Sequence, residues 1–413
     1  MPGVQAIPLQ PEDRAILDLE DETVAGHTCK VIRLGEGAPD LGELRSLVAD
    51  RIEAAPELLW SLGESGGAVA WVPCADFEIA DRVRETGAVA EDGIAPLVAS
   101  LFERRLDRAR PLWRMDYARV REGGGVLVWR IHHALADGTS CVRLARELLW
   151  DRAETAPARA GGGRHAELDH ARRRRHLAAF AERELVESVR RSPFDGQVGT
   201  TRAVAFATVP LAPLHDAAKE LAGATINDAV LALVAGSLRH WIEARHGSLA
   251  GVRARVPVSL HREGDAVANR DSFFTLHLPL AEPDPVARLR AVHAATAVRK
   301  AEHDAEVREE LLRRLGAHPH LEGLCERIER SPRSFALSVS NVPGPSAPVD
   351  VLGASVTGLH SLAEIGARHG LRIAVVSLAG DLQFGFCADP AIVDGLDAMA
   401  SGIEEEARAL DGA

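Results

Sequence analysis

The 413-residue chain is poor in cysteine, and the few cysteines follow no disulfide or zinc-binding pattern. The five are odd in number and far apart, and no two of them form a Cys-x-x-Cys pair: Cys29, Cys74, Cys141, Cys325 and Cys387. This spacing excludes a disulfide framework and indicates scattered buried thiols in a reducing compartment.

Long hydrophobic runs are also absent. The most apolar stretches, residues 229–238 and 373–378, are well short of the ~20 residues that a membrane-spanning helix needs. Residues 1–5 contain no basic segment leading into an apolar one, so the sequence predicts no secretory signal. We therefore expect a soluble cytoplasmic protein, with peripheral contact to a membrane left open.

Positive charge is in deficit, because 60 acidic residues face 48 basic ones and the net charge is −12. This balance argues against a nucleic-acid partner, since affinity for phosphate backbones comes mainly from a basic surface. Only Lys30, Lys219 and Lys300 are lysines, which we interpret as the habit of a GC-rich genome. Hydrophobic residues at 46% and charged residues at 26% are ordinary for a globular chain, whose length predicts two packed domains.

The N-terminal part alternates predicted helices and strands. Apolar residues at helical spacing predict helices over residues 40–55, 94–106 and 139–150, the second of them ending before Pro111. The apolar stretch 126–133 follows three glycines and predicts a buried strand. We assign residues 1–150 to a first domain.

A compositional change follows residue 150. Residues 156–163 are rich in Ala, Pro and Gly, and four arginines stand at 172–175, so we expect a linker with an exposed helix over residues 151–200. The arginine run is more typical of a solvated helix face than of a contact with a membrane or a phosphate-bearing ligand.

The C-terminal part, residues 201–413, is predicted to form a second domain. Thr225 and Asp228 have the spacing of a capping box, and an apolar stripe from Ile226 to Ile242 predicts a helix that ends at Gly247. A further helix is expected over residues 285–305, and a hairpin over residues 371–378 and 382–387 around Gly380-Asp381. The fold class is therefore mixed α/β in two halves.

The most informative segment is His132-His133-Ala134-Leu135-Ala136-Asp137-Gly138, at the end of the predicted strand. Side chains alternate along a strand, so the two histidines should point to opposite faces and should not chelate one metal together. One can face a cleft as a base while the other packs behind it. Two satisfied core histidines are the alternative, and a single histidine would favour it.

Three further motifs accompany this segment: Pro111-Leu112-Trp113, Asn227-Asp228, and Ser340-Asn341-Val342-Pro343-Gly344-Pro345. Together the four motifs resemble the bacterial wax ester synthase/diacylglycerol acyltransferase family, a group of O-acyltransferases. The resemblance extends nearly from end to end, since residues 8–13 look like the opening segment, residues 256–260 like the middle strand and residues 382–389 like the C-terminal hairpin.

The resemblance implies two similar chloramphenicol-acetyltransferase-like domains, each a mixed sheet flanked by helices, with a tunnel at their interface. It implies acyl transfer from acyl-CoA, a co-substrate with no other cofactor, to a lipophilic alcohol such as diacylglycerol or a fatty alcohol, without a covalent acyl-enzyme. The products would be triacylglycerol or wax ester, which places the chain in lipid biosynthesis. Contact with a membrane or lipid droplet stays possible.

The same resemblance suggests roles for the motif residues. We expect His133 to be the general base, because a neutral imidazole with a pKa near 7 suits the removal of an alcohol proton. His132 would support the segment from behind, Gly138 would allow close approach, and Asp137 would hold the loop by pairing with a buried Arg that the sequence does not identify.

The accessory residues have weaker assignments as substrate-binding residues. Asn227 and Asp228 are as well explained by helix-start chemistry as by substrate contact, and Trp113 fits core packing better than substrate contact. Asn341 lies in a rigid turn that would shape the tunnel. His318 and His320 flank a proline but have no carboxylate or cysteine pattern around them, so no metal site is predicted.

Several departures from the family pattern concern the substrate. Gly26-His27 stands where Met-His is common, Leu359-His360 where an aromatic residue and proline are common, and Arg82 where a His is common. These differences leave the acceptor open. Two alternatives remain: a condensation-type acyltransferase of specialised metabolism that uses a carrier protein or a polyketide-type substrate, and a lipid-binding protein without catalytic activity.

Overall fold

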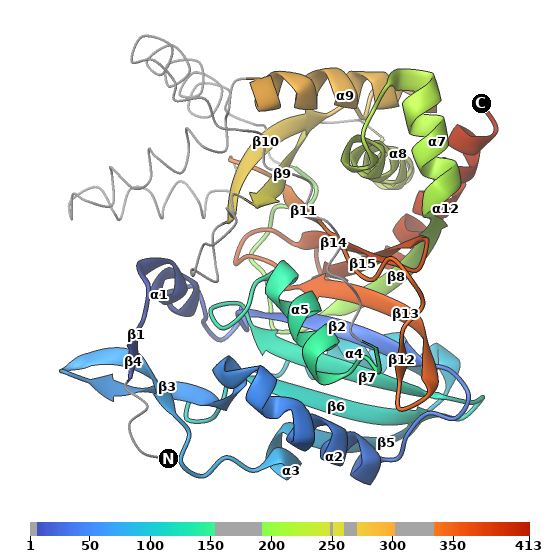
Figure 1. The fold of residues 1–413 in the computed structure, drawn as a ribbon. Helices are drawn as coiled ribbons and strands as arrows, with labels where there is room; N and C mark the ends of the chain where they lie inside the picture. The colour runs from blue at the N-terminus through green and yellow to red at the C-terminus, as the bar shows by residue number, and fades with distance from the viewer. Residues whose placement is uncertain (1–5, 153–191, 248–250, 260–270, 302–333) are drawn as a thin grey trace.

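The computed structural model describes residues 6–152, 192–247, 251–259, 271–301 and 334–413, and two six-stranded mixed sheets form its body (Figure 1). In spatial order the first sheet consists of β12 (Asp350–Val351), β13 (Ala354–Ala363), β2 (His27–Leu34), β7 (Gly125–His132), β6 (Trp113–Val120) and β5 (Val83–Val89). The second consists of β10 (Asp271–Leu278), β9 (Val252–Ser259), β11 (Leu337–Val342), β14 (Leu371–Leu378), β15 (Asp381–Ala388) and β8 (Ala203–Pro210). A small third sheet has the order β1 (Ile7–Pro8), β4 (Ala68–Pro73) and β3 (Trp60–Ser65).

Helices cover the outer faces of these sheets. One face of the first sheet packs against α2 (Leu41–Arg51) and α5 (Gly138–Leu148), and the other against α4 (Ile94–Phe102). One face of the second sheet packs against α7 (Leu211–Ala222), α8 (Ile226–His246), α9 (Pro285–Ala301) and α12 (Leu396–Asp411). Short helices α1 (Pro11–Asp18) and α3 (Ile79–Arg82) lie beside the first sheet. The predicted mixed α/β architecture with two sheets is confirmed.

Strand β13 joins the two halves. It comes from the second half of the sequence, yet it pairs antiparallel with β2 of the first sheet, with Ser361 opposite Lys30 and Ala363 opposite Thr28. It also packs against β15: a Cβ on Gly385 would lie 2.0 Å from the Ser361 carbonyl oxygen, so only glycine lets the two backbones approach this closely. The division into domains 1–150 and 201–413 stays a prediction. The first sheet crosses it, because β13 belongs to the second of these ranges.

The predicted helix starts agree with the structure. Thr225 accepts a hydrogen bond from the Asp228 backbone N–H while the Asp228 carboxylate accepts one from the Thr225 N–H, which is the predicted capping box of α8. Gly247 ends this helix at φ 66°, in the left-handed region that favours glycine. Asp40 caps α2 in the same reciprocal manner with Glu43.

Two predicted boundaries differ from the structure. Helix α4 ends at Phe102 rather than near residue 106, because the Arg130 guanidinium donates hydrogen bonds to the Leu101 and Arg104 carbonyls at its end, 2.7 and 2.6 Å away. The hairpin of β14 and β15 turns at Ala379-Gly380, one residue earlier than predicted, with φ of 49° and 97° at the two positions.

Several predictions cannot be compared with the structure, because they concern residues outside the described ranges. The linker helix, the arginine run 172–175, Cys325 and His318-Pro319-His320 lie in segments that the structure does not describe. Within the described ranges, Cys29, Cys74, Cys141 and Cys387 are free thiols. No single helix there has the length and hydropathy of a membrane span; α7 and α8 pass that test only as a pair, bent by 94°.

Candidate active site

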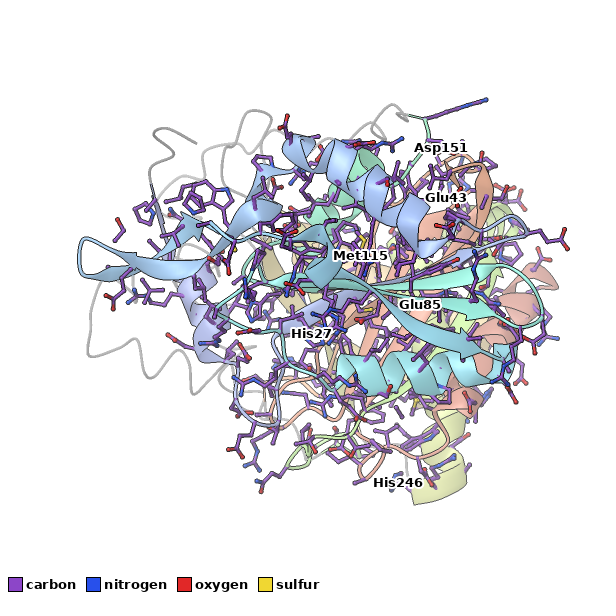
Figure 2. The ribbon with its side chains drawn as sticks, turned by 90° about the horizontal axis from the view of Figure 1, so that it is seen from below. His27, Glu43, Glu85, Met115, Asp151 and His246 are labelled. Carbon is purple, nitrogen blue, oxygen red and sulfur yellow. The ribbon has the colours of Figure 1, made fainter. Side chains whose placement is uncertain are left out.

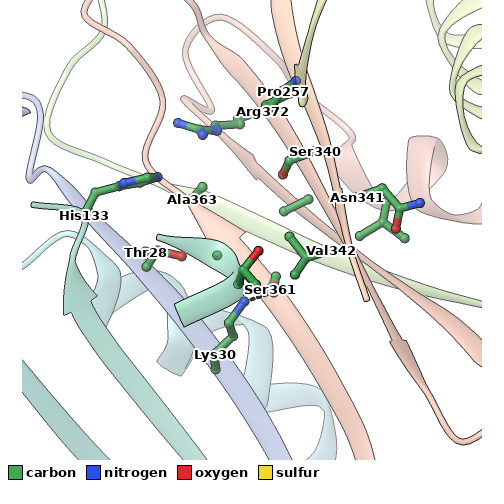
Figure 3. Close-up of a pocket in the computed structure, with 14 residues that line it drawn as sticks. Thr28, Lys30, His133, Pro257, Ser340, Asn341, Val342, Ser361, Ala363 and Arg372 are labelled. Atoms are coloured by element: carbon green, nitrogen blue, oxygen red, sulfur yellow. Dashed lines mark hydrogen bonds between the residues drawn. The ribbon is translucent and has the colours of Figure 1, made fainter. Parts of the chain in front are cut away.

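His133 lies one residue beyond β7, at the junction of the two sheets. Its backbone N–H leaves the β7 ladder and donates to the Gly26 carbonyl at 2.9 Å, which ends the strand at His132. The side chain faces a cavity (Figure 3). From the first half and β13 the cavity is lined by Thr28, Lys30, His133, Gly138, Thr139, Ser361 and Ala363, and from the second sheet by Pro257, Ser340, Asn341, Val342, Arg372, Ala374 and Val375.

The electrostatics of His133 favour the neutral imidazole. Burial, the largest cause, and the charge of Arg372 together lower the pKa of His133 to about 4, while the Asp137 carboxylate acts in the opposite direction. This value differs from the pKa near 7 expected from the sequence, because the ring is buried and also faces the Arg372 cation. At neutral pH the ring is therefore unprotonated and able to accept a proton.

This pKa predicts an unusually acidic limit to activity. Because only neutral His133 can act as a base, kcat/KM should be level between about pH 6 and pH 8 and should fall only as the pH approaches the lowered pKa of about 4. The measurement is a pH–rate profile of kcat/KM in buffers of constant ionic strength. Arg372→Gln removes one cause of the lowering, so its acidic limb should move to higher pH. A wild-type limb near pH 6.5 would contradict this assignment.

His132 lies behind the catalytic segment, as its strand position predicts. It is 1% exposed, its Nδ1 accepts a hydrogen bond from the Ala134 N–H at 3.2 Å, and its Nε2 lies 3.4 Å from a Glu20 carboxylate oxygen. Burial raises the pKa of Glu20, but hydrogen bonds with His132, Arg105 and Arg108 outweigh it and lower the value to about 2. The sequence did not single out Glu20, because its role follows only from its contacts with His132, Arg105 and Arg108 in the folded chain.

Gly26 sets the entry into this segment. Its φ of 66° lies in the left-handed region, and a Cβ there would come within 2.7 Å of the His132 ring. Its carbonyl also holds the His133 backbone N–H. The departure from the family's Met-His pair thus has a structural counterpart, since glycine leaves room for His132. His27, the next residue, is buried between the first sheet and α4 with its ring edge-on to Phe102 at 4.5 Å (Figure 2).

Asp137 and Gly138 begin helix α5. The Asp137 carboxylate is buried and accepts a hydrogen bond from the Ser140 N–H at 2.6 Å, so it is the N-cap of α5. A Cβ on Gly138 would lie 3.0 Å from the Val342 side chain, so glycine lets α5 begin close to β11 across the cavity. The pairing of Asp137 with a buried Arg stays a prediction.

Replacement of Asp137 should affect stability and activity together. Asp137→Ala is expected to lower the free energy of unfolding by roughly 1 kcal/mol through the lost cap, and to lower activity because the loop between His133 and α5 loosens. Asp137→Asn should retain most of the stability, because asparagine also caps helices. Thermal unfolding and kcat/KM of both variants provide the test; activity lost with unchanged melting would refute the positioning role.

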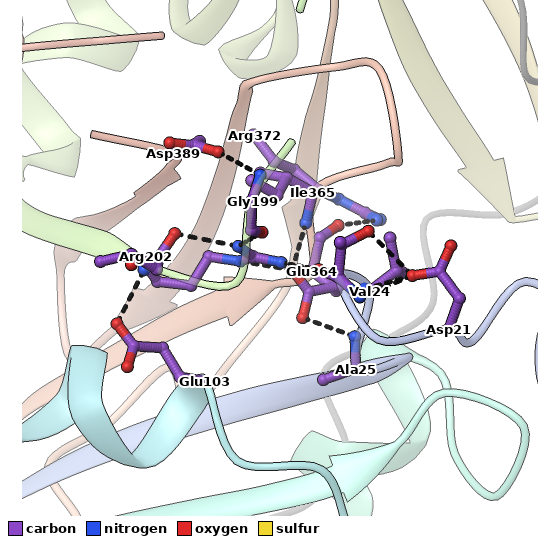
Figure 4. A network of polar contacts seen from close by, with 12 residues as sticks. Asp21, Val24, Ala25, Glu103, Gly199, Arg202, Glu364, Ile365, Arg372 and Asp389 are labelled. Carbon is purple, nitrogen blue, oxygen red and sulfur yellow. Dashed lines mark hydrogen bonds and ion pairs between the residues drawn. The ribbon is translucent and has the colours of Figure 1, made fainter. Parts of the chain in front are cut away.

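A buried polar network next to the cavity joins segments from both halves (Figure 4). Arg202 donates from Nε to Glu364 at 2.9 Å and from Nη1 to the Gly199 and Thr201 carbonyls. The other Glu364 oxygen accepts from the Ala25 N–H at 3.1 Å, and the Glu364 carbonyl accepts from Arg372 at 3.0 Å. The network therefore holds three parts of the site in place. These are the end of β13, which carries Ser361, the segment before β2 at Ala25, and the Arg372 guanidinium, which faces His133.

The structure brings only part of the predicted substrate-binding set to the cavity. Asn341 lines it. Trp113 does not: it is fully buried in the first core, and its Nε1 donates to the Leu58 carbonyl at 2.7 Å. This agrees with the core packing that the sequence favoured, because a buried indole needs an acceptor and finds one in the protein.

Asp228 is likewise a structural residue. Its buried carboxylate accepts hydrogen bonds from Thr225 and Thr296, at 2.9 and 2.6 Å, and lies 2.9 Å from His293 Nδ1, which ties α8 to α9. Burial raises the pKa of Asp228, but these hydrogen bonds prevail and lower it. Asn227, half-buried in the first turn of α8, is not among the residues that line the cavity. The Asp228 contacts are those of a helix start and of the packing of α8 on α9, and the substrate-binding assignments of Asn227 and Asp228 stay predictions.

The polar residues of the cavity that were not identified from the sequence include Lys30, Ser361 and Arg372. Lys30 is one of only three lysines in the chain, and this scarcity was the available signal. Ser361 and Arg372 carry no local signal, because nothing in their neighbourhood shows that β13 pairs with β2 and packs against β14 here. Among the described residues, no group of three or more His, Cys, Asp or Glu side chains could hold a metal ion.

Two mixed-sheet halves with a His-His-x-x-x-Asp-Gly segment at their junction have the chloramphenicol-acetyltransferase-like fold. The first condensation domain of the CDA synthetase shares this fold, with a TM-score of 0.65 and 16% identity over 98% of this chain and 96% of that one.

Comparison with family models gives the more particular assignment. Residues 9–183 match the wax ester synthase/diacylglycerol acyltransferase catalytic domain, and residues 267–411 match the WS/DGAT C-terminal domain. The chain therefore belongs to the wax ester synthase/diacylglycerol acyltransferase family, and it is an acyltransferase of that type in lipid biosynthesis.

Relatives and structures agree with this family. The chain is 28% identical to the "Probable diacyglycerol O-acyltransferase tgs1" of Mycobacterium tuberculosis H37Rv, over 82% of this chain and 80% of that protein. It is also 28% identical to tgs2 of the same strain, over 85% of each chain. The wax ester synthase/diacylglycerol acyltransferase from Marinobacter aquaeolei VT8 has a TM-score of 0.75 and 21% identity, covering 98% of this chain and 100% of that one.

Proposed function

We propose that the protein transfers a long acyl chain from acyl-CoA to the hydroxyl group of a lipophilic alcohol, in the cavity beside His133. A diacylglycerol acceptor would give triacylglycerol, and a fatty alcohol would give a wax ester. One observation carries the proposal: a neutral histidine faces a cavity to which both sheets contribute, within a chain of this acyltransferase family.

His133 moves the proton in this reaction. As the alcohol oxygen attacks the thioester carbonyl, the ring accepts the hydroxyl proton, so that the oxygen bonds to carbon without developing a full negative charge. The tetrahedral intermediate then breaks its carbon–sulfur bond, and the same ring returns the proton to the leaving sulfur of CoA. No acyl-enzyme forms, and His133 ends the cycle in its starting state.

The proposed acceptors, diacylglycerol and fatty alcohols, partition into membranes and lipid droplets, so the proposed reaction suggests where the protein works. We propose a cytoplasmic protein that collects a lipophilic alcohol at the surface of a membrane or lipid droplet. Flotation with lipid vesicles that contain the acceptor, compared with vesicles that lack it, tests this part separately from catalysis.

The test of the activity is thiol release from palmitoyl-CoA, read with a thiol reagent, with diacylglycerol, hexadecanol, short polar alcohols or no acceptor. We expect release that depends on an acceptor. Absence of release with every acceptor would contradict the proposal as stated. Recovery of transfer with an acylated carrier protein would then identify the condensation-type alternative, whereas ligand binding without transfer would identify a binding protein.

A further inference from the structure

Lys30 places an ammonium group in the wall of the cavity. The side chain is 1% exposed and comes from the centre of β2, on the face that packs against α5. Its neighbours on this face include Ile32 and, across the ladder on β13, Leu359, both buried and apolar. Lys30 and the opposite Ser361 therefore interrupt an apolar face at the point where it borders the cavity.

The ammonium has one neutral partner among the residues that the structure describes. Nζ donates to the Ser361 hydroxyl at 2.5 Å, the hydrogen bond drawn in Figure 3, although an ammonium has three N–H donors. Within the same described ranges no carboxylate lies at ion-pair distance from it. Burial lowers the pKa of Lys30, and the nearby Asp137 charge acts against this. A buried cation with a single neutral partner is costly unless a ligand supplies the missing acceptors.

Arg372 contributes a second buried cation to the same cavity. Its Nη1 donates to the Glu364 carbonyl at 3.0 Å, but its buried Nε has no hydrogen-bond partner in the described part of the chain. A carboxylate close to it, that of Glu364, is already bonded to Arg202 and to the Ala25 and Ile365 N–H groups. None of the described residues that line the cavity is acidic.

A purely apolar acyl chain or alcohol would leave these donors unsatisfied. We propose that one of the two substrates carries a carboxylate, which Lys30, Ser361 and Arg372 bind in the cavity beside His133. This inference rests on the proposed acyl transfer and changes one of its two substrates: an acid, such as a hydroxy acid acceptor or a dicarboxylic acyl donor, takes the place of a neutral acceptor or a simple acyl chain. The hydroxy acid and the dicarboxylic acyl group share one chemistry: a carboxylate whose two oxygens accept hydrogen bonds from N–H and O–H groups.

Binding of a carboxylate that cannot react tests the site without turnover. Decanoate should bind the wild-type protein at least 10-fold more tightly than methyl decanoate in calorimetric titrations. Lys30→Met has a similar length without the charge and should weaken decanoate binding by roughly 10- to 100-fold, the range of a lost charged hydrogen bond. Lys219→Met makes the same substitution at an exposed lysine of α7 and should change nothing. Equal binding of decanoate and its ester, or decanoate binding that Lys30→Met leaves unchanged, overturns the proposal.

Turnover then identifies which substrate carries the acid. With decanoyl-CoA as donor, 3-hydroxydecanoate is compared with its methyl ester; with decanol as acceptor, decanedioyl-CoA is compared with decanoyl-CoA. A preference of kcat/KM for the acid in either pair, reduced by both Lys30→Met and Arg372→Gln, supports the inference and assigns the source. Equal losses on charged and neutral substrates would show a role in transition-state stabilisation and contradict it. Failure of all transfer would refute the proposed function alone, because the decanoate titration still decides the anion site.

Discussion

Replacement of His133 by alanine is expected to lower kcat/KM for acyl transfer by roughly 10²- to 10⁴-fold, the usual contribution of a general base. The alcohol would have to attack without a proton acceptor in the cavity, and the CoA sulfur would leave without a proton donor. The measurement is acceptor-dependent thiol release at saturating acyl-CoA, accompanied by a melting curve.

The fold of this variant should survive. The ring faces an existing cavity and is uncharged at neutral pH, so its removal leaves no uncompensated buried charge. His215→Ala is a matched control, because His215 is an exposed histidine of α7 far along the chain from the cavity. Turnover of His133→Ala close to that of the control would refute the assignment of the base.

Breaking the ion pair between Arg202 and Glu364 should have the largest effect on stability. Both side chains are buried, at 5% and 6% exposure, and removal of one partner leaves the other charge without compensation. Arg202→Met is therefore expected to lower the free energy of unfolding by about 3–5 kcal/mol, measured by urea denaturation.

Two further measurements separate charge from packing in this network. Burial already raises the pKa of Glu364 despite Arg202, and without the guanidinium the carboxyl should titrate higher still. The folded variant then binds more protons than the unfolded chain, so its stability should fall as the pH rises through that pKa and the defect should be smaller at pH 5 than at pH 8. The double variant Arg202→Met/Glu364→Leu should recover much of the loss; a single variant that unfolds like the wild type would contradict the account.

Local signals in the sequence predicted much of the fold. The capping box at Thr225, the glycine at 247 and the apolar stripe between them define α8 because each acts within a few residues of the chain. The same holds for the buried strand that ends in the two histidines, since alternation and the preceding glycines are local properties. The family motifs added the arrangement of two similar halves, which periodicity alone does not give.

Features that depend on distant pairing were not predictable. Ser361 lies opposite Lys30 because β13 crosses to the first sheet, a pairing between residues more than 300 positions apart. The helix predicted over residues 94–106 ends early because Arg130, on another element, binds the Leu101 carbonyl in its last turn and the Arg104 carbonyl just beyond it. The scarcity of lysine can be read from the sequence. The burial of Lys30 in the same cavity as His133 cannot, because it depends on the distant pairing of β13 with β2.

The central claim is direct acyl transfer at His133, and formation of the ester product tests it most directly. The wild-type protein, palmitoyl-CoA with a labelled acyl chain and a responsive acceptor are incubated together, and mass spectrometry counts the labelled ester against the CoA released. The account predicts one ester for each CoA, no labelled protein at any time, and neither product above background with His133→Ala. CoA release without ester, a labelled acyl-enzyme, or ester formation by the variant at the wild-type rate would contradict it.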